Sequence, residues 1–402
     1  MFRKKQKYNK NDILLFILVA SLAAGSMSGV WQLPRTFSLL FLLDFLSKIN
    51  LKRSFAKPIT FLIAWACYAA VSLVWTSDFG NGLIDEALLI CNILLFSEIL
   101  LYAAMAREPV KTISTGWFFA LIVTSVIGIW EIFTNNHLAT SKTGDYAQMV
   151  SEGQLVMHNY ATATFFNYNS YVVFICYCLP FLLYLYFSSN GIYKKVLYVS
   201  SLIVAIFILF MNASRGGIIA LIIIISVFAY PMLKKGGSFK TILVLAVILV
   251  VALISLWDEI SLYVMIRTQE VGSFEDEARY DIWMRALRCF FPTLGFGTGV
   301  GSIAASMQAI SSSGDVIVPH NALLELLVQF GLIISVACLL FFFKIFKRGM
   351  TLVVNCEKSL VLSCVISFPF VMIIDSSYLA TPAIWAFWAS LYMISILGVK
   401  VK

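Results

Sequence analysis

Apolar runs of about twenty residues follow one another along most of this chain. A helix of that length crosses the hydrocarbon core of a bilayer, where only helices and closed barrels satisfy their own backbone groups. Sixty per cent of the 402 residues are hydrophobic and 12% are charged, about half the charged fraction of a soluble domain. The sequence therefore predicts an all-α polytopic membrane protein in which residues 1–402 form a single integral membrane domain.

The apolar runs predict about twelve transmembrane helices. They lie near residues 12–30, 36–49, 58–75, 84–106, 112–133, 168–189, 192–212, 216–233, 240–257, 320–346, 357–375 and 378–398. The second run is short, follows Pro34 and carries Asp44, so this segment either crosses, pairs with the first as a tight hairpin, or fails to cross. Two connections on the same side are long: a first outer loop at 134–167 and a large outer loop at 258–319, between the ninth and tenth helices.

Basic residues divide unequally between the two sides of this topology. Twelve crossings place 22 of the 29 basic residues on one side and leave seven on the other: Arg35, Lys142, Arg215, Arg267, Arg279, Arg285 and Arg288. By the positive-inside rule the first side is cytoplasmic, so both termini lie there and the long loops face outwards. The net charge of +8 is spread over many short loops. This spread favours membrane lipids over nucleic acid as the partner of the basic residues.

Neither a metal site nor a disulfide framework is expected. The eight cysteines lie mostly inside apolar runs, and none forms a CxxC pair. The acidic run Glu275-Asp276-Glu277 is better explained as a solvated face than as a set of metal ligands. We therefore predict no cofactor.

The large outer loop combines a helical pattern with a glycine run. Arg279 is followed at helical spacing by apolar residues from Ile282 and Trp283 to Phe290, and glycines then occupy alternate positions from Gly295 to Gly301. This pattern predicts an amphipathic helix on the membrane surface, followed by a tightly turned segment. A lid or packing element is the alternative.

Arginine marks the outward side, because six of its seven basic residues are Arg. Arg forms bidentate contacts with phosphate or carboxylate. Arg215 stands in the polar step Asn212-Ala213-Ser214-Arg215-Gly216-Gly217 between two apolar runs, where a charge is expensive and where glycines allow close backbone approach. The alternative is a snorkelling topological anchor.

His320 opens the tenth run in Pro319-His320-Asn321, with Glu325 one turn later. A histidine facing a polar outward cavity is suited to act as a general base. A satisfied interfacial histidine is the alternative. His137 and His158 are interpreted as loop residues.

These residues, taken in order, resemble the O-antigen ligase and Wzy-type polysaccharide polymerase family of bacterial envelope enzymes. The resemblance covers roughly 166–332. Four blocks carry it: Phe166-Asn167-Tyr168-Asn169 before Leu179-Pro180, then Ser214-Arg215-Gly216, then Arg279 through Trp283 to Gly295–Gly299, and His320-Asn321 through Glu325 to Gly331-Leu332. One departure is Gln329, where an acid is common in the family.

The resemblance implies transfer of a glycan from a polyprenyl-diphosphate donor to a hydroxyl of a glycan acceptor, outside the bacterial cytoplasmic membrane. His320, Arg215 and Arg279 are then the candidate catalytic residues. The candidate substrate-binding residues are Arg288, Asn321, Glu325, Asn167, Asn169 and Trp283. A flippase and a chain-length regulator are the expected protein partners.

Two alternatives remain open from the sequence. A transporter or flippase also suits twelve spans, but the two halves of the chain show no convincing repeat. A ligase differs from a polymerase only in its acceptor, which is lipid A core or protein. The Lys-, Ile- and Phe-rich composition favours a genome poor in G and C, typical of organisms without lipid A, and so favours the polymerase.

Overall fold

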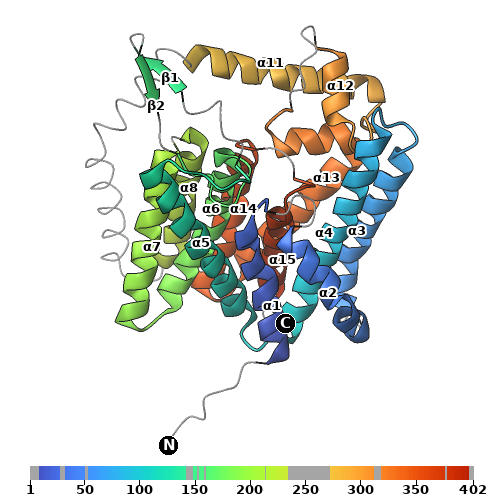
Figure 1. Cartoon of the computed structure of the whole chain (residues 1–402). Coiled ribbons are helices and arrows are strands. Elements are labelled where there is room, and N and C mark those ends of the chain that lie inside the picture. The colour runs from blue at the N-terminus through green and yellow to red at the C-terminus, as the bar shows by residue number, and fades with distance from the viewer. Residues whose placement is uncertain are drawn as a thin grey trace, which may run out of the picture.

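The computed structural model describes ten stretches of the chain. These are residues 9–27, 32–49, 53–141, 148–151, 154–157, 160–212, 214–233, 272–311, 318–375 and 378–397. They form a helical bundle with one small β-hairpin in the first long loop (Figure 1). The elements are α1 (Lys10–Ala20), η1 (Ser21–Ala24), α2 (Leu33–Lys48), α3 (Arg53–Ser72), α4 (Phe79–Met105), α5 (Pro109–Thr134), β1 (Gln148–Ser151), β2 (Gln154–Met157), α6 (Tyr168–Ser188), α7 (Ile192–Met211), α8 (Arg215–Leu233), α11 (Gly272–Phe290), η3 (Phe291–Thr293), α12 (Ile303–Ala309), α13 (Ala322–Thr351), α14 (Asn355–Met372) and α15 (Pro382–Leu397).

The described helices confirm a multi-pass membrane protein. Six of them are long and apolar enough to cross a bilayer: α4, α5, α6, α7, α13 and α14. Shorter apolar helices lie at Lys57–Ser72, Arg215–Tyr230 and Pro382–Leu397. The expected span at 240–257 lies outside the described residues, and the number of twelve crossings stays a prediction. The expected all-α fold class is confirmed for the described residues, and a small antiparallel hairpin of β1 and β2 lies within the loop 134–167.

Local signals account for where several helices begin. The Asp78 carboxylate caps α4 by accepting from the backbone N–H of Asn81 at 3.0 Å, and this bond lowers the pKa of Asp78. Pro109 occupies the first turn of α5, where its missing N–H costs no helical hydrogen bond. The apolar runs alone predicted starts at residues 84 and 112, whereas the two helices begin earlier, at Phe79 and Pro109, where these local signals stand.

The first expected span, 12–30, is not one continuous α-helix. The α-helix α1 ends at Ala20, and the 3₁₀ turn η1 ends before Gly25, which has φ +52°. A Cβ at Gly25 would lie within 3 Å of the carbonyl group of Thr164. The chain leaves the helix here because another segment, 160–166, approaches the Gly25 backbone.

The centre of the bundle is aromatic. The helix α15 is buried from Pro382 to Ser395, as expected of a helix that is apolar on every side. The ring of Tyr177 on α6 stacks on Phe387 of α15 at 4.4 Å, and Trp117 of α5 stacks on Phe181 of α6 at 5.3 Å. These contacts hold α5, α6 and α15 together and leave their end loops to build the site.

One end of the bundle is covered by α11, which runs across the other helices (Figure 1). We call it the α11 end. The described apolar side chains of α11 pack on protein: Ala286 and Cys289 are buried against Ile303 and Met307 of α12 and Val328 of α13. The expected helix is therefore confirmed, but this face of it covers α12 and α13 and does not lie on lipid.

A break divides α13, expected as one continuous helix over 320–346, into two parts. Gly331 has φ +74° and ψ −171°, outside the helical region. The backbone of residues 295 and 296 occupies the space beside it, so that a Cβ on Gly331 would lie 2.1 Å from the carbonyl oxygen of Gly295. Only glycine allows this approach, and the turn it creates places residues 322–330 apart from the long second half of α13.

Candidate active site

The predicted histidine stands in a tightly held turn at the start of α13. The Asn321 side chain caps α13 by accepting from the backbone N–H groups of Leu323 and Leu324, both at 3.1 Å. His320 has φ +48°, a left-handed conformation that non-glycine residues rarely adopt. Such a conformation persists only where the surrounding structure imposes it. Asn321 is thus an N-cap beside His320, and its expected contact with substrate stays a prediction.

Trp283 contributes a second restraint on the same turn. Its indole Nε1–H on α11 donates to the carbonyl oxygen of Pro319 at 2.9 Å. The sequence predicted Trp283 as substrate-binding, whereas in the structure its donor is engaged by the protein. This hydrogen bond joins the two predicted blocks around Trp283 and His320.

The glycine run, residues 295–301, is hydrogen-bonded to α13 around its break at Gly331. Thr298 N–H donates to the carbonyl oxygen of Val328 at 2.7 Å, and Gly299 N–H donates to that of Gln329 at 3.0 Å. Leu332 N–H returns a bond to the carbonyl oxygen of Gly295 at 2.8 Å. The expected tight turn is confirmed, and its glycines serve close packing against the break in α13.

Arg215 begins α8 at the α11 end. The hydroxyl of Ser214 accepts from Gly217 N–H at 3.2 Å and so caps the helix. Gly216 packs on Ile374 and Gly217 on Val172, with no room for a Cβ. Arg215 itself is exposed. A helix start carries partial positive charge, which disfavours a cation there. Arg215 and the helix start therefore both favour a bound anion.

The Asn167 block has a capping role as well. The Asn167 Oδ1 accepts from the backbone N–H of Ser170 at 2.8 Å and starts α6. The Ser170 hydroxyl also donates to the carboxylate of Asp375. Asn169 lies half-buried in the first turn of α6. Asn167 thus holds Ser170, which in turn contacts Asp375, 205 positions later in the chain.

The connection between α14 and α15 links these blocks, and it was expected only as a short turn. Ile374 contacts Gly216 beside Arg215, and Asp375 contacts Ser170. Tyr378 donates its hydroxyl to the Oε1 of Gln329 at 3.0 Å, one turn beyond Glu325 on α13. Glu325 itself is buried, with 4% of its surface exposed.

Arg35 holds this connection from α2. Its guanidinium, 3% exposed, donates to the Ala380 carbonyl oxygen at 2.7 Å and to Asn92 Oδ1 at 3.2 Å. Asn92 in turn donates to the carbonyl oxygen of Leu379 at 2.6 Å. Sequence reasoning grouped Arg35 with the other outward basic residues. It missed this role because the Ala380 carbonyl group lies 345 positions further along the chain.

The remaining predicted residues lie on α11. Arg288 is exposed in the last turn of that helix. Arg279 belongs to α11, but its side chain lies outside the described part, as do those of the acidic run 275–277. Among the described residues, no three His, Cys, Asp or Glu side chains gather as metal ligands. The absence of a metal site in the whole protein stays a prediction.

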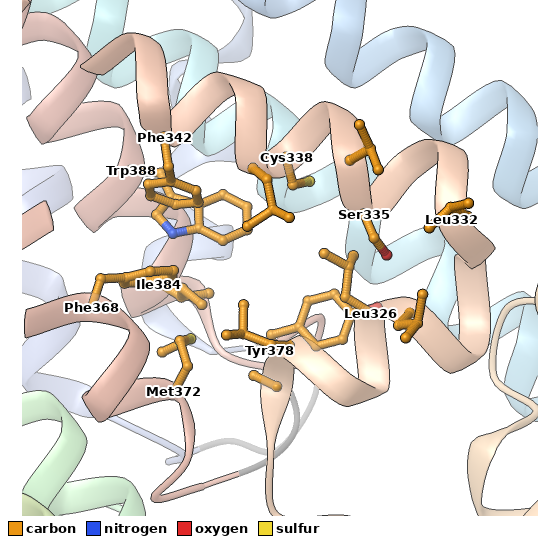
Figure 2. Close-up of a pocket in the computed structure, with 15 residues that line it drawn as sticks. Leu326, Leu332, Ser335, Cys338, Phe342, Phe368, Met372, Tyr378, Ile384 and Trp388 are labelled. Atoms are coloured by element: carbon orange, nitrogen blue, oxygen red, sulfur yellow. The ribbon is translucent and has the colours of Figure 1, made fainter. Parts of the chain in front are cut away.

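An apolar pocket of about 300 Å³ is lined by α13 together with Phe368 of α14 and Trp388 of α15 (Figure 2). Ala322 and Leu323, which follow Asn321, form one part of its wall, and Tyr378 of the α14–α15 connection forms another. Leu332 and Leu339, both exposed on the second half of α13, line it as well. The pocket thus extends from the candidate site to an exposed apolar face of α13.

Comparison with known proteins agrees with the order of the blocks. Residues 200–339 match the family described as O-Antigen ligase. The resemblance to the O-antigen ligase and polymerase family is confirmed. This match includes Arg215, Arg279, Arg288 and His320.

A curated relative extends the likeness beyond that segment. The chain is 27% identical over 296 residues to the teichuronic acid biosynthesis protein TuaE of Bacillus subtilis (strain 168). The match covers 69% of this chain and 58% of the length of that relative.

Proposed function

We propose that this protein is a membrane glycosyltransferase that moves a glycan from a polyprenyl-diphosphate donor to a hydroxyl of an acceptor glycan. The observation that carries the proposal is the family match over 200–339. Two contacts of the α14–α15 connection support it. Ile374 packs against Gly216 beside Arg215, and Tyr378 bonds Gln329 of α13. The relative named for teichuronic acid biosynthesis favours a biosynthetic enzyme over a transporter.

In the proposed reaction, His320 accepts the proton of the acceptor hydroxyl as its oxygen attacks the anomeric carbon. The bond between that carbon and the diphosphate oxygen breaks, and the polyprenyl diphosphate leaves with both bonding electrons. Direct displacement of this kind inverts the anomeric configuration. The turn that holds His320 through Asn321 and Trp283 keeps the base in one orientation, as such a step requires.

Positive charge stabilises the leaving diphosphate in this proposal. Arg215 and the start of α8 supply it from one helix, and Arg279 and Arg288 supply it from α11. Because Arg stabilises phosphate oxygens directly, no divalent ion is required. The apolar pocket beside Ala322 and Leu323 would take the first part of the polyprenyl chain.

Polymerisation of capsular or exopolysaccharide repeat units, or of O-antigen units, is the form of the reaction that we favour. Transfer to lipid A core or to protein, as a ligase, is the second candidate. In either case we place the enzyme in the bacterial cytoplasmic membrane with both termini cytoplasmic and its site outwards. A flippase would deliver its donor, and a chain-length regulator could set the product size.

The test replaces His320 or Arg215 with Ala in cells that make the polysaccharide. We expect both variants to reach the membrane in normal amount and to lose long-chain product. Lys194→Ala is the matched control, because Lys194 is an exposed basic residue near the start of α7. Normal chain lengths in both site variants would contradict the assignment. Loss of activity of the purified enzyme with EDTA, restored by Mg²⁺, would contradict the metal-independent mechanism.

A further inference from the structure

Three large apolar side chains stand exposed where α11 turns into the glycine run. Phe291 is 68% exposed, Leu294 is 88% exposed and Phe296 is 52% exposed. We call these three residues the apolar corner. They belong to the large loop and lie outside the predicted spans, where exposed apolar clusters usually mark a contact with a partner or a membrane.

Leu294 is exceptional within the apolar corner. It has φ +54°, in the left-handed region, where glycine and asparagine are the usual residues. A leucine kept there with its side chain directed outwards contributes little to the protein interior. Any stabilisation that this side chain provides must therefore come from a contact outside the protein.

Two hydrogen bonds fix the position of the apolar corner relative to the end of α3. Tyr68 on α3 donates its hydroxyl to the carbonyl oxygen of Phe296, and Trp75 Nε1 donates to that of Gly297 at 3.2 Å. Trp and Tyr with an apolar body and one engaged polar group are typical of the interface between membrane and water. The apolar corner thus lies level with the end of α3.

Exposed apolar residues of the bundle continue this surface. Val74, Trp75 and Phe79 stand exposed around the turn from α3 to α4. Leu332 and Ile333 stand exposed where the long half of α13 begins, and Leu332 N–H bonds the Gly295 carbonyl oxygen. Since α13 is long and apolar enough to span a bilayer, the lipid-facing surface is continuous with the apolar corner.

We propose that the apolar corner inserts into the bilayer leaflet at the α11 end and that its partner is lipid hydrocarbon. The corner then acts as an interfacial anchor for the loop that carries α11. Trp283 of α11 contacts Pro319, so this anchor also sets the position of the turn that holds His320. The proposal rests on the membrane-spanning character of the chain and does not depend on the proposed reaction.

The experiment places a fluorescent probe on a cysteine at position 294. Leu294→Cys is made in a Cys67→Ala background, because Cys67 is an exposed thiol. The full-length protein is labelled with a polarity-sensitive dye and reconstituted into lipid nanodiscs. Asp281→Cys, at an exposed acidic position of α11, the helix that leads into the apolar corner, is the matched control. Phe291→Cys is a second probe of the apolar corner.

Two quenchers then distinguish lipid from water. We expect nitroxide groups near the top of the acyl chains to quench most of the emission from positions 294 and 291, and aqueous iodide to quench the control. The emission from both corner positions should also be blue-shifted relative to the control. Iodide quenching at 294 and 291 equal to that at 281 would overturn the proposal. Protection from both quenchers would overturn it too, because protein would then cover the corner.

Discussion

Replacing Gly331 with Ala tests how the glycine run and α13 are joined. Gly331 has φ +74° and ψ −171°, a combination open essentially to glycine alone. A Cβ there would lie 2.1 Å from the Gly295 carbonyl oxygen and 2.5 Å from the carbonyl carbon of Phe296. Both are backbone atoms, so relief requires the whole glycine segment to move.

The magnitude follows from these contacts. The unfavourable conformation costs about 2 kcal/mol in the folded state. Moving the segment also breaks the three backbone hydrogen bonds that join 295–299 to 328–332, at 2.7, 2.8 and 3.0 Å. Each contributes about 1 kcal/mol, so the total loss is about 5 kcal/mol, at the upper end for a single substitution.

Gly80→Ala is the matched control. Gly80 lies in the first turn of α4, and a Cβ there would meet only the Asp78 side chain, at an ordinary 3.7 Å. Alanine in a helix is favoured over glycine by up to about 1 kcal/mol, so this variant should be unchanged or slightly more stable.

The assay is the apparent thermal midpoint of purified protein in one detergent, read as the loss of monodisperse protein by size exclusion. We expect Gly331→Ala to have a markedly lower thermal midpoint than the unsubstituted protein. Gly80→Ala should not lower the thermal midpoint. Polysaccharide synthesis in cells should fall with the first variant alone. Equal midpoints, together with normal product, would refute the reasoning.

Two further predictions concern α11. Trp283→Phe keeps an aromatic side chain but removes the indole N–H that donates to the Pro319 carbonyl oxygen, a bond that contributes about 1 kcal/mol. We expect a lower turnover with little change in thermal midpoint, and an unchanged turnover in a rate assay would contradict the positioning role. Burial raises the pKa of the Cys289 thiol, so the reactive thiolate is scarce at neutral pH. Alkylation of Cys289 in the folded protein should therefore be slow and should accelerate as pH rises, and fast labelling at neutral pH, measured by mass spectrometry, would contradict this environment.

Much of the helical framework was predictable because its signals are local. Apolar runs and capping residues such as Asp78 and Asn321 act within one helical turn, and the helices begin close to where these residues stand. Departures arise where a distant segment intervenes. The early end of α1 depends on the approach of Thr164 to Gly25, and the break in α13 depends on residues 295 and 296.

The candidate site divides in the same way. His320 and Arg215 were identified from their neighbours in sequence. Arg215 begins α8, whereas His320 lies just before the N-cap Asn321 and outside the helix that was expected to start with it. Asp375 and Arg35 were not assigned to the site. Asp375 lies in a short connection without a motif, and its contact with Ser170 spans 205 positions.

The sequence alone determined that this chain belongs in a membrane, where its apolar helices lie and which residues bear the family resemblance. These properties depend on composition and on spacing within single segments. Only the tertiary structure decided that the turn at His320 is held from α11, that the glycine run fills the break in α13, and that Arg35 holds the α14–α15 connection. Each of these depends on which carbonyl group lies within about 3 Å of a given donor, a distance set by packing of segments far apart in the chain.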